Sequence, residues 1–198
     1  MPYIGAGFQR FNTANGLTVN GNTDIYGDTI KLDGNYPNGT GNVALGDAAL
    51  DDGSLSGANN TAIGNTALTK NTTGAGNTAL GSNAGAVITT GSKNIAIGNY
   101  TLDANTTGAE NTGVGTYCLG ANTTAGNNTA VGYISLTSNT TGAQNVALGS
   151  GSLSTNTTAS YNTGLGYYAL GLNTTGANNV AVGHLAIYDN TTGTQNTS

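Results

Sequence analysis

The chain contains the unit NTAVGYISLTSNTTGAQ at residues 128–144, and the same pattern begins again at Asn145. An Asn followed by a short aliphatic tetrad recurs at every seventeenth position, at Asn60, Asn77, Asn94, Asn111, Asn128, Asn145, Asn162, Asn179 and Asn196. An earlier copy starts at Asn42, and the step from there to Asn60 is longer by one residue. A fixed period of this kind is the sequence signature of a repeat protein. We number the positions of each repeat 1–17 from this Asn.

Three positions of the repeat have a clear physical meaning. Position 4 is always Leu, Ile or Val, and position 9 is Leu or Ile in every strict copy except the one with Gly85, so we expect these two side chains to form a thin core. Position 5 is always Gly, which suits a sharp bend with positive φ or a close approach of two backbones. We therefore expect a structural corner at Gly64, Gly81, Gly98, Gly115, Gly132, Gly149, Gly166 and Gly183.

The length of the repeat decides the fold class. Seventeen residues are too few for a helical hairpin repeat, which needs about 33 residues, and too few for a propeller blade. Two short β-like runs separated by a Gly corner and an Asn-Thr-Thr-Gly turn fit one coil of a parallel β-solenoid. Equivalent residues of successive coils then stack about 4.8 Å apart, and ladders of Asn amides offset the small apolar core. The sequence predicts an all-β parallel solenoid over residues 42–198, strict from residue 60.

Composition and charge exclude several classes of partner. Gly, Asn and Thr, with 33, 29 and 34 residues, make up nearly half of the 198 residues. Only four basic residues stand against nine acidic ones, for a net charge of −5, so the chain has no electrostatic footprint for nucleic acid or an anionic membrane. No stretch approaches the roughly 20 apolar residues of a membrane helix. The N-terminus has neither a basic region nor an apolar region of the kind found in a secretory signal.

Few residues are suited to catalysis or metal binding. Cys118 and His184 are each alone in the sequence, so we expect no metal cluster and no cofactor. Cys118 occupies position 8, otherwise Ala, Ser or Thr, and is expected in the core, whereas His184 at position 6 is expected at the surface or an interface. The acidic residues of the strict repeats, Asp103, Glu110 and Asp189, occupy different positions of the repeat and do not form the carboxylate pair of a glycosidase. The sequence favours a protein that is not an enzyme.

Tyrosines recur at two neighbouring positions of the repeat. Aromatic side chains of this kind bind sugar rings and also pack subunit interfaces. Both a subunit contact and a receptor contact therefore remain open for the predicted stripe, which contains Tyr100, Tyr117 and Tyr168 at position 7 and Tyr133 and Tyr167 at position 6.

The N-terminal segment 1–41 differs from the repeats. Short alternating runs such as Leu17–Val19 are broken by turn dipeptides such as Asn20-Gly21, which is typical of brief strands. The opening segment adds apolar residues that no core of its own absorbs: Tyr3, Ile4, Phe8 and Phe11. We interpret this segment as a docking arm, and the alternative is a disordered tail.

The assembly state follows from the size of the coil. Two aliphatic side chains and a few alanines per coil bury too little apolar surface to offset the entropy of ordering the whole coil. Several solenoids that press one face together along a common axis would make up the deficit. We expect a homotrimer, the usual arrangement in fibres of this shape.

These repeats resemble those of two known groups of proteins. The pentads Asn42–Gly46, Asn60–Gly64 and Asn145–Gly149 are similar to the head repeats of trimeric autotransporter adhesins, which form left-handed parallel β-roll trimers. The longer form of the repeat, with Tyr167–Leu170 before its Asn-Thr-Thr-Gly turn, more closely resembles repeats of bacteriophage tail fibres. The opening Tyr3–Phe11 resembles the virion-attachment segment of a marine or cyanobacterial phage fibre.

The resemblance implies a left-handed solenoid in an intertwined or side-by-side homotrimer. It also implies a structural virion protein whose N-terminus docks to phage tail or neck proteins through Tyr3, Ile4, Phe8, Arg10 and Phe11. The repeats then form a rigid spacer that reaches toward a glycan or protein of the host surface.

Two other functions remain open. A bacterial cell-surface adhesin or extracellular filament is built on the same kind of roll. An ice-binding protein is the more remote alternative, because ranks of Thr from Thr72-Thr73 to Thr191-Thr192 recur at coil spacing. Adjacent Thr residues in a strand point to opposite sides, however, whereas an ice-binding face needs its Thr residues on one side.

Overall fold

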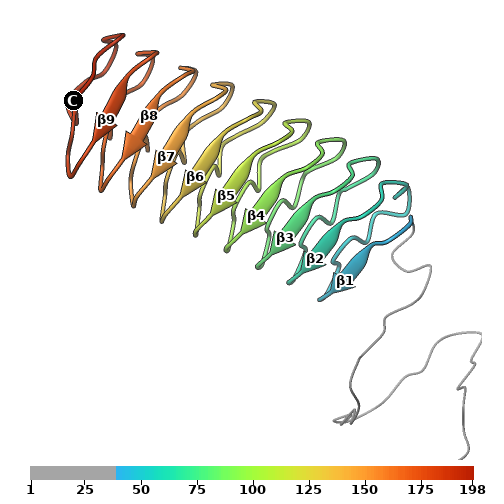
Figure 1. The fold of residues 1–198 in the computed structure, drawn as a ribbon. Helices are drawn as coiled ribbons and strands as arrows, with labels where there is room; N and C mark the ends of the chain where they lie inside the picture. The colour runs from blue at the N-terminus through green and yellow to red at the C-terminus, as the bar shows by residue number, and fades with distance from the viewer. Residues whose placement is uncertain (1–38) are drawn as a thin grey trace, which may run out of the picture. The chain divides into compact units, whose positions relative to one another are not determined.

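The computed structural model describes residues 39–198 and confirms the parallel β-solenoid (Figure 1). Nine three-residue strands stack in chain order into one parallel sheet, and the described residues form no helix. The strands are β1 Val43–Leu45, β2 Thr61–Ile63, β3 Thr78–Leu80, β4 Ile95–Ile97, β5 Thr112–Val114, β6 Thr129–Val131, β7 Val146–Leu148, β8 Thr163–Leu165 and β9 Val180–Val182.

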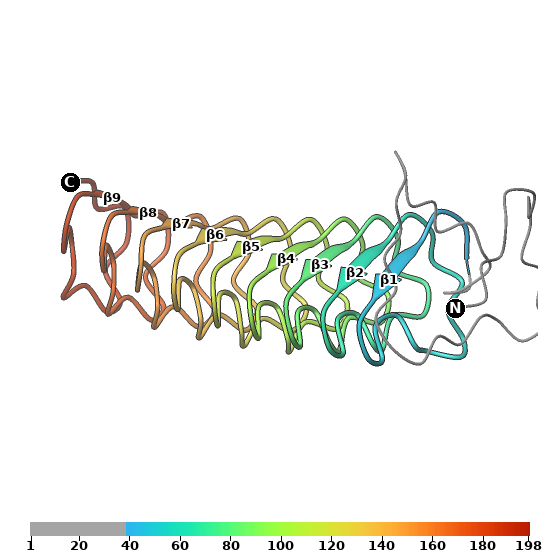
Figure 2. The same ribbon diagram turned by 90° about the horizontal axis from the view of Figure 1, so that it is seen from below.

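The register of the sheet follows the repeat. Each strand consists of positions 2–4, and Ala62 pairs with Ala79, which in turn pairs with Ala96. The longer first step keeps this register, because Ala44 pairs with Ala62. An isolated parallel bridge between Val180 and Thr197 extends the stack beyond β9. Seen from below, the chain winds one coil per strand along the row (Figure 2).

The Gly at position 5 turns the chain directly after each strand. Its φ lies between 132° and 138° in all nine coils from Gly46 to Gly183. The coils also approach closely here, since a Cβ on Gly132 would lie 2.6 Å from the carbonyl oxygen of Gly149 in the next coil. Both the backbone angle and the contact therefore require a residue without a side chain.

The prediction of a second β-like run in each coil, after the Gly corner, is wrong. Positions 7 and 9 have positive φ in every strict coil, as at Thr66 (55°) and Leu68 (50°), which is incompatible with an extended strand. The backbone still binds both neighbouring coils, because Thr66 N–H donates to Asp47 O at 2.8 Å and Leu68 N–H donates to Ala84 O at 3.1 Å. The alternating conformation lets the chain turn back within one short coil while its N–H groups keep partners.

The core is thinner than predicted. Position 9 is buried as expected, from Leu68 to Leu170, and it packs with small residues at positions 3 and 8. The expectation that position 4 belongs to the core is wrong, since Leu80 is 46% exposed and Leu165 is 44% exposed. Side chains alternate between the two faces of a strand, so the small residue at position 3 points inward and positions 2 and 4 point outward.

Candidate functional site

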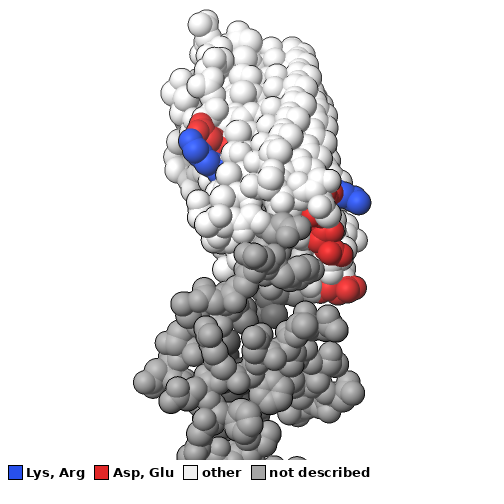
Figure 3. Space-filling model, turned by 90° about the vertical axis from the view of Figure 1, so that its right-hand side faces the viewer, with Lys and Arg blue, Asp and Glu red and all other residues white. Residues whose placement is uncertain are grey.

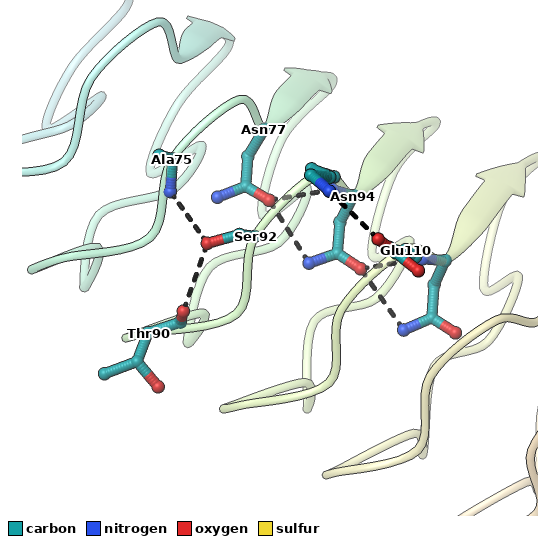
Figure 4. Close-up of polar contacts among 8 residues, drawn as sticks. Ala75, Asn77, Thr90, Ser92, Asn94 and Glu110 are labelled. Atoms are coloured by element: carbon teal, nitrogen blue, oxygen red, sulfur yellow. Dashed lines mark hydrogen bonds and ion pairs between the residues drawn. The ribbon is translucent and has the colours of Figure 1, made fainter.

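A ladder of Asn side chains at position 1, buried from Asn60 to Asn179, joins every coil to the next. Figure 4 draws the part of this ladder around Asn77 and Asn94. The backbone N–H and Nδ2 of Asn94 donate to Oδ1 of Asn77 at 2.9 and 3.2 Å. Nδ2 of Asn94 also donates to Gly108 O at 2.9 Å. The amide therefore satisfies backbone groups that this thin coil buries without a strand partner.

A second Asn ladder runs through position 12. Nδ2 of Asn139 donates to Oδ1 of Asn122 at 3.0 Å and to Gly142 O at 2.8 Å, within its own turn. Gly142 O also accepts a hydrogen bond from Nδ2 of Asn128 at 2.9 Å, so the two ladders meet at this carbonyl. The Asn-Thr-Thr-Gly turn is thus fixed from both sides by amides.

The two threonines of each turn differ in their environment. Thr106 is half-buried and its hydroxyl donates to Thr123 O in the next coil at 3.1 Å. Thr107 is exposed, as is every residue at position 14 in the strict coils. The Thr residues at position 14 therefore form an exposed rank, whereas the hydroxyl at position 13 is used in a hydrogen bond between coils.

The chemically reactive residues are scattered. Cys118 is fully buried, its thiol donates to Ala130 O at 3.1 Å, and burial raises the pKa of this thiol to about 12. Burial also raises the pKa of Asp103. Glu110 forms an exposed ion pair with Lys93 at 3.1 Å, and Asp189 lies on a different coil. In residues 39–198 no three His, Cys, Asp or Glu side chains come together as a metal site, and no pocket is found.

Nothing in the described range forms a helix with the length and hydropathy needed to span a bilayer.

The predicted tyrosine stripe is divided into separate groups. Tyr100 and Tyr117 stack at 5.3 Å between ring centroids with an angle of 8°. Tyr167 stacks on His184 at 5.4 Å and 7°, and it meets Tyr168 edge to face at 4.7 Å. In both stacks one face of each ring is covered by the other ring. Tyr133 is exposed, and no described aromatic ring stacks on it.

The outward face of the sheet is a surface that the sequence pattern did not lead us to expect. Positions 2 and 4 of the nine strands form two straight columns, and none of their residues is charged. In the view of Figure 3 the charged side chains of the described range gather in a few small groups, and most of the described surface in view is uncharged. The signal was present in the sequence, because a three-residue strand with Ala or Gly at its centre has one inward position and two outward ones.

The proposed attachment residues Tyr3, Ile4, Phe8, Arg10 and Phe11 lie outside the described residues. Residues 39–41 are described and already belong to the stack, since Asn59 N–H donates to Thr40 O at 2.9 Å.

Comparison with known proteins adds no family. No protein-family model, no curated protein and no solved structure matches the chain.

Proposed function

We propose that this chain is a structural fibre protein of a bacteriophage virion, a tail fibre whose repeats form a rigid spacer, and that it is not an enzyme. One observation carries the proposal: the hydrogen-bond ladders of position 1 run without interruption from Asn42 to Asn196. Each added coil lengthens the sheet by about 4.8 Å and repeats the same internal bonds. A rod of near-identical coils is better suited to act as a spacer than to form a pocket that selects one ligand.

The proposal assigns different roles to the two parts of the chain. The apolar residues near the N-terminus dock to tail or neck proteins, and the solenoid projects from the particle as a homotrimer. A glycan or protein of the host surface is the proposed distal partner, and nucleic acid is not a partner. The resemblance of the pentads and of Tyr3–Phe11 to fibre sequences supports this assignment.

An adhesin or extracellular filament of a bacterial surface is the alternative, because the same rod serves either purpose. The location of the protein separates the two functions. Antibodies against residues 39–198 are expected to label tail fibres of purified phage particles in electron micrographs. Labelling of bacterial surfaces without labelling of particles would overturn the virion assignment in favour of the adhesin.

Two deletions test the division of roles within the particle. Removal of residues 128–144 takes out one complete repeat, so it should shorten the fibre by about 4.8 Å and leave incorporation intact. Removal of residues 2–11 should leave a folded solenoid that no longer joins the particle. Incorporation that survives the N-terminal deletion but not the loss of one repeat would reverse the proposed roles.

A further inference from the structure

The outward column at position 4 is a continuous aliphatic strip. Its residues are paired in register through all nine strands: Leu45, Ile63, Leu80, Ile97, Val114, Val131, Leu148, Leu165 and Val182. They range from half-buried to strongly exposed, and Val182 is 55% exposed. Position 4 is thus aliphatic in every coil although it does not contribute to the core of its own chain.

The surroundings of this strip are also uncharged. The neighbouring column at position 2 holds Thr, Val or Ile, and position 5 on the other side is always Gly. Nine strands spaced at about 4.8 Å, each three residues or about 10 Å long, give an outward area of about 400 Å² for the two columns together. The largest apolar patch of a typical monomer measures about 300–600 Å² and is often functional, so an area of this size is suited to an interaction.

The dimensions of the strip restrict what can cover it. A specific interface buries about 800 Å² on each partner, so a partner must use the whole length of the strip and some of its flanks. Such a partner needs a straight, uncharged surface with the same spacing of about 4.8 Å. A second copy of this chain presents that surface, and its aliphatic column meets the first at matching intervals.

We propose that the outward face of β1–β9 is the surface through which copies of this chain pack side by side, with their solenoid axes parallel and the strips at the shared axis. The choice of a parallel orientation rests on the proposed function, because a fibre attached through its N-terminus needs all N-termini at one end. The choice of the face rests on the structure alone.

Sedimentation of the purified full chain tests the face. The wild-type mass is expected to be about three times the 19.5 kDa of one chain. The double variant Val131→Lys/Leu165→Lys, two coils apart on the strip, should sediment as a monomer of 19.5 kDa with a β-type circular dichroism spectrum. The matched control Thr141→Lys/Thr175→Lys, at the same spacing on exposed position 14, should keep the wild-type mass. A monomeric wild type, or an oligomer that the strip variant leaves intact, would overturn the proposal.

Cross-linking tests the same face without placing charges on it. In a Cys118→Ser background, Ile63→Cys and Val182→Cys are prepared separately and treated with a short bis-maleimide. Each variant should link to itself, because β2 meets β2 and β9 meets β9 in a parallel assembly, whereas Thr141→Cys should not link. Links that form only when the two variants are mixed would overturn the parallel orientation and leave the proposed face in place.

Both measurements use the isolated protein and are therefore independent of the virion. Failure to label phage particles would remove the proposed function but not the contact face. Thermal hysteresis from a monomeric wild type that the strip variant abolishes would assign the face to ice and overturn the self-packing proposal.

Discussion

Ile88 fills the space beside Gly85 that a Leu or Ile at position 9 fills in the other strict coils. A Cβ on Gly85 would lie 2.9 Å from Cδ1 of Ile88 and 3.1 Å from Cδ2 of Leu68. Ile88 is fully buried and stands at position 12, where the other strict coils have the ladder Asn. The two departures from the repeat are therefore one compensated change: position 9 loses its side chain and position 12 supplies the missing volume.

The replacement interrupts the second Asn ladder. Oδ1 of Asn71 is buried and has no hydrogen-bond partner, whereas Oδ1 of Asn105 accepts from Nδ2 of Asn122 at 2.9 Å. A buried acceptor without a partner costs about 1–3 kcal/mol. The coil of residues 77–93 thus keeps its core packing, and the position-12 ladder loses the hydrogen bond to Oδ1 of Asn71.

We expect strong coupling between these two positions. Ile88→Asn alone should destabilise the fold by about 2–4 kcal/mol because it leaves a cavity, and Gly85→Leu alone by about 1–3 kcal/mol because it overfills the site. The double variant restores the repeat and gives Asn71 a donor, so it should be at least as stable as the wild type. Urea unfolding of all four proteins measures the cycle. Additive effects of the two single changes would contradict the compensation.

We expect each hydrogen bond of the position-1 Asn ladder to contribute more to the free energy of unfolding than a hydrogen bond at the surface does. In Asn128→Ala the buried N–H of Asn145 loses its acceptor, which lies 2.9 Å away in the wild type. Together with the small cavity, this should lower the free energy of unfolding by about 2 kcal/mol. Thr141→Ala on exposed position 14 is the control and should change it by less than about 0.5 kcal/mol. Equal effects of the two substitutions would show that the ladder contributes nothing specific.

Position 5 should not tolerate a side chain. Gly132→Ala places a Cβ 2.6 Å from Gly149 O at a φ of 134°, and we expect a loss of about 3 kcal/mol or more in the free energy of unfolding. Gly120→Ala is the matched control, because its nearest contact would be 3.4 Å away and its φ is not positive. Thermal melts followed by circular dichroism compare the two variants. A stable Gly132→Ala protein would rule out the tight contact between the coils.

The buried thiol gives a pH dependence of known sign. Burial raises the pKa of Cys118 from 9.0 to about 12, so between these values the folded thiol stays neutral while the unfolded one ionises. Its contribution to stability is fully present below pH 9 and is lost as the pH rises toward 12. Because Ser135 makes the same type of bond to Ala147 O at 3.1 Å, Cys118→Ser should fold normally. Urea unfolding at pH 8 and pH 10 should show a larger loss for the wild type than for Cys118→Ser, and parallel losses would contradict the burial.

The topology of the solenoid could be predicted from the period of the repeat. Hydrogen-bond partners in a solenoid lie one period apart, so the constant step already pairs Ala62 with Ala79 and Asn77 with Asn94. The Gly at position 5 and the buried Leu at position 9 were equally readable, because a sharp bend and a large apolar residue each leave a local mark.

The side of each short strand that faces inward depends instead on the closed coil. The period is the same whether Leu80 points into the coil or out of it, and the cross-section of the closed coil leaves room only for Ala79. The arrangement of Ile88 over Gly85 also depends on contacts within the closed coil. Repetition along the chain therefore fixes which residues stack on one another, whereas the narrow space inside each coil fixes which of them is buried and which is left for a partner.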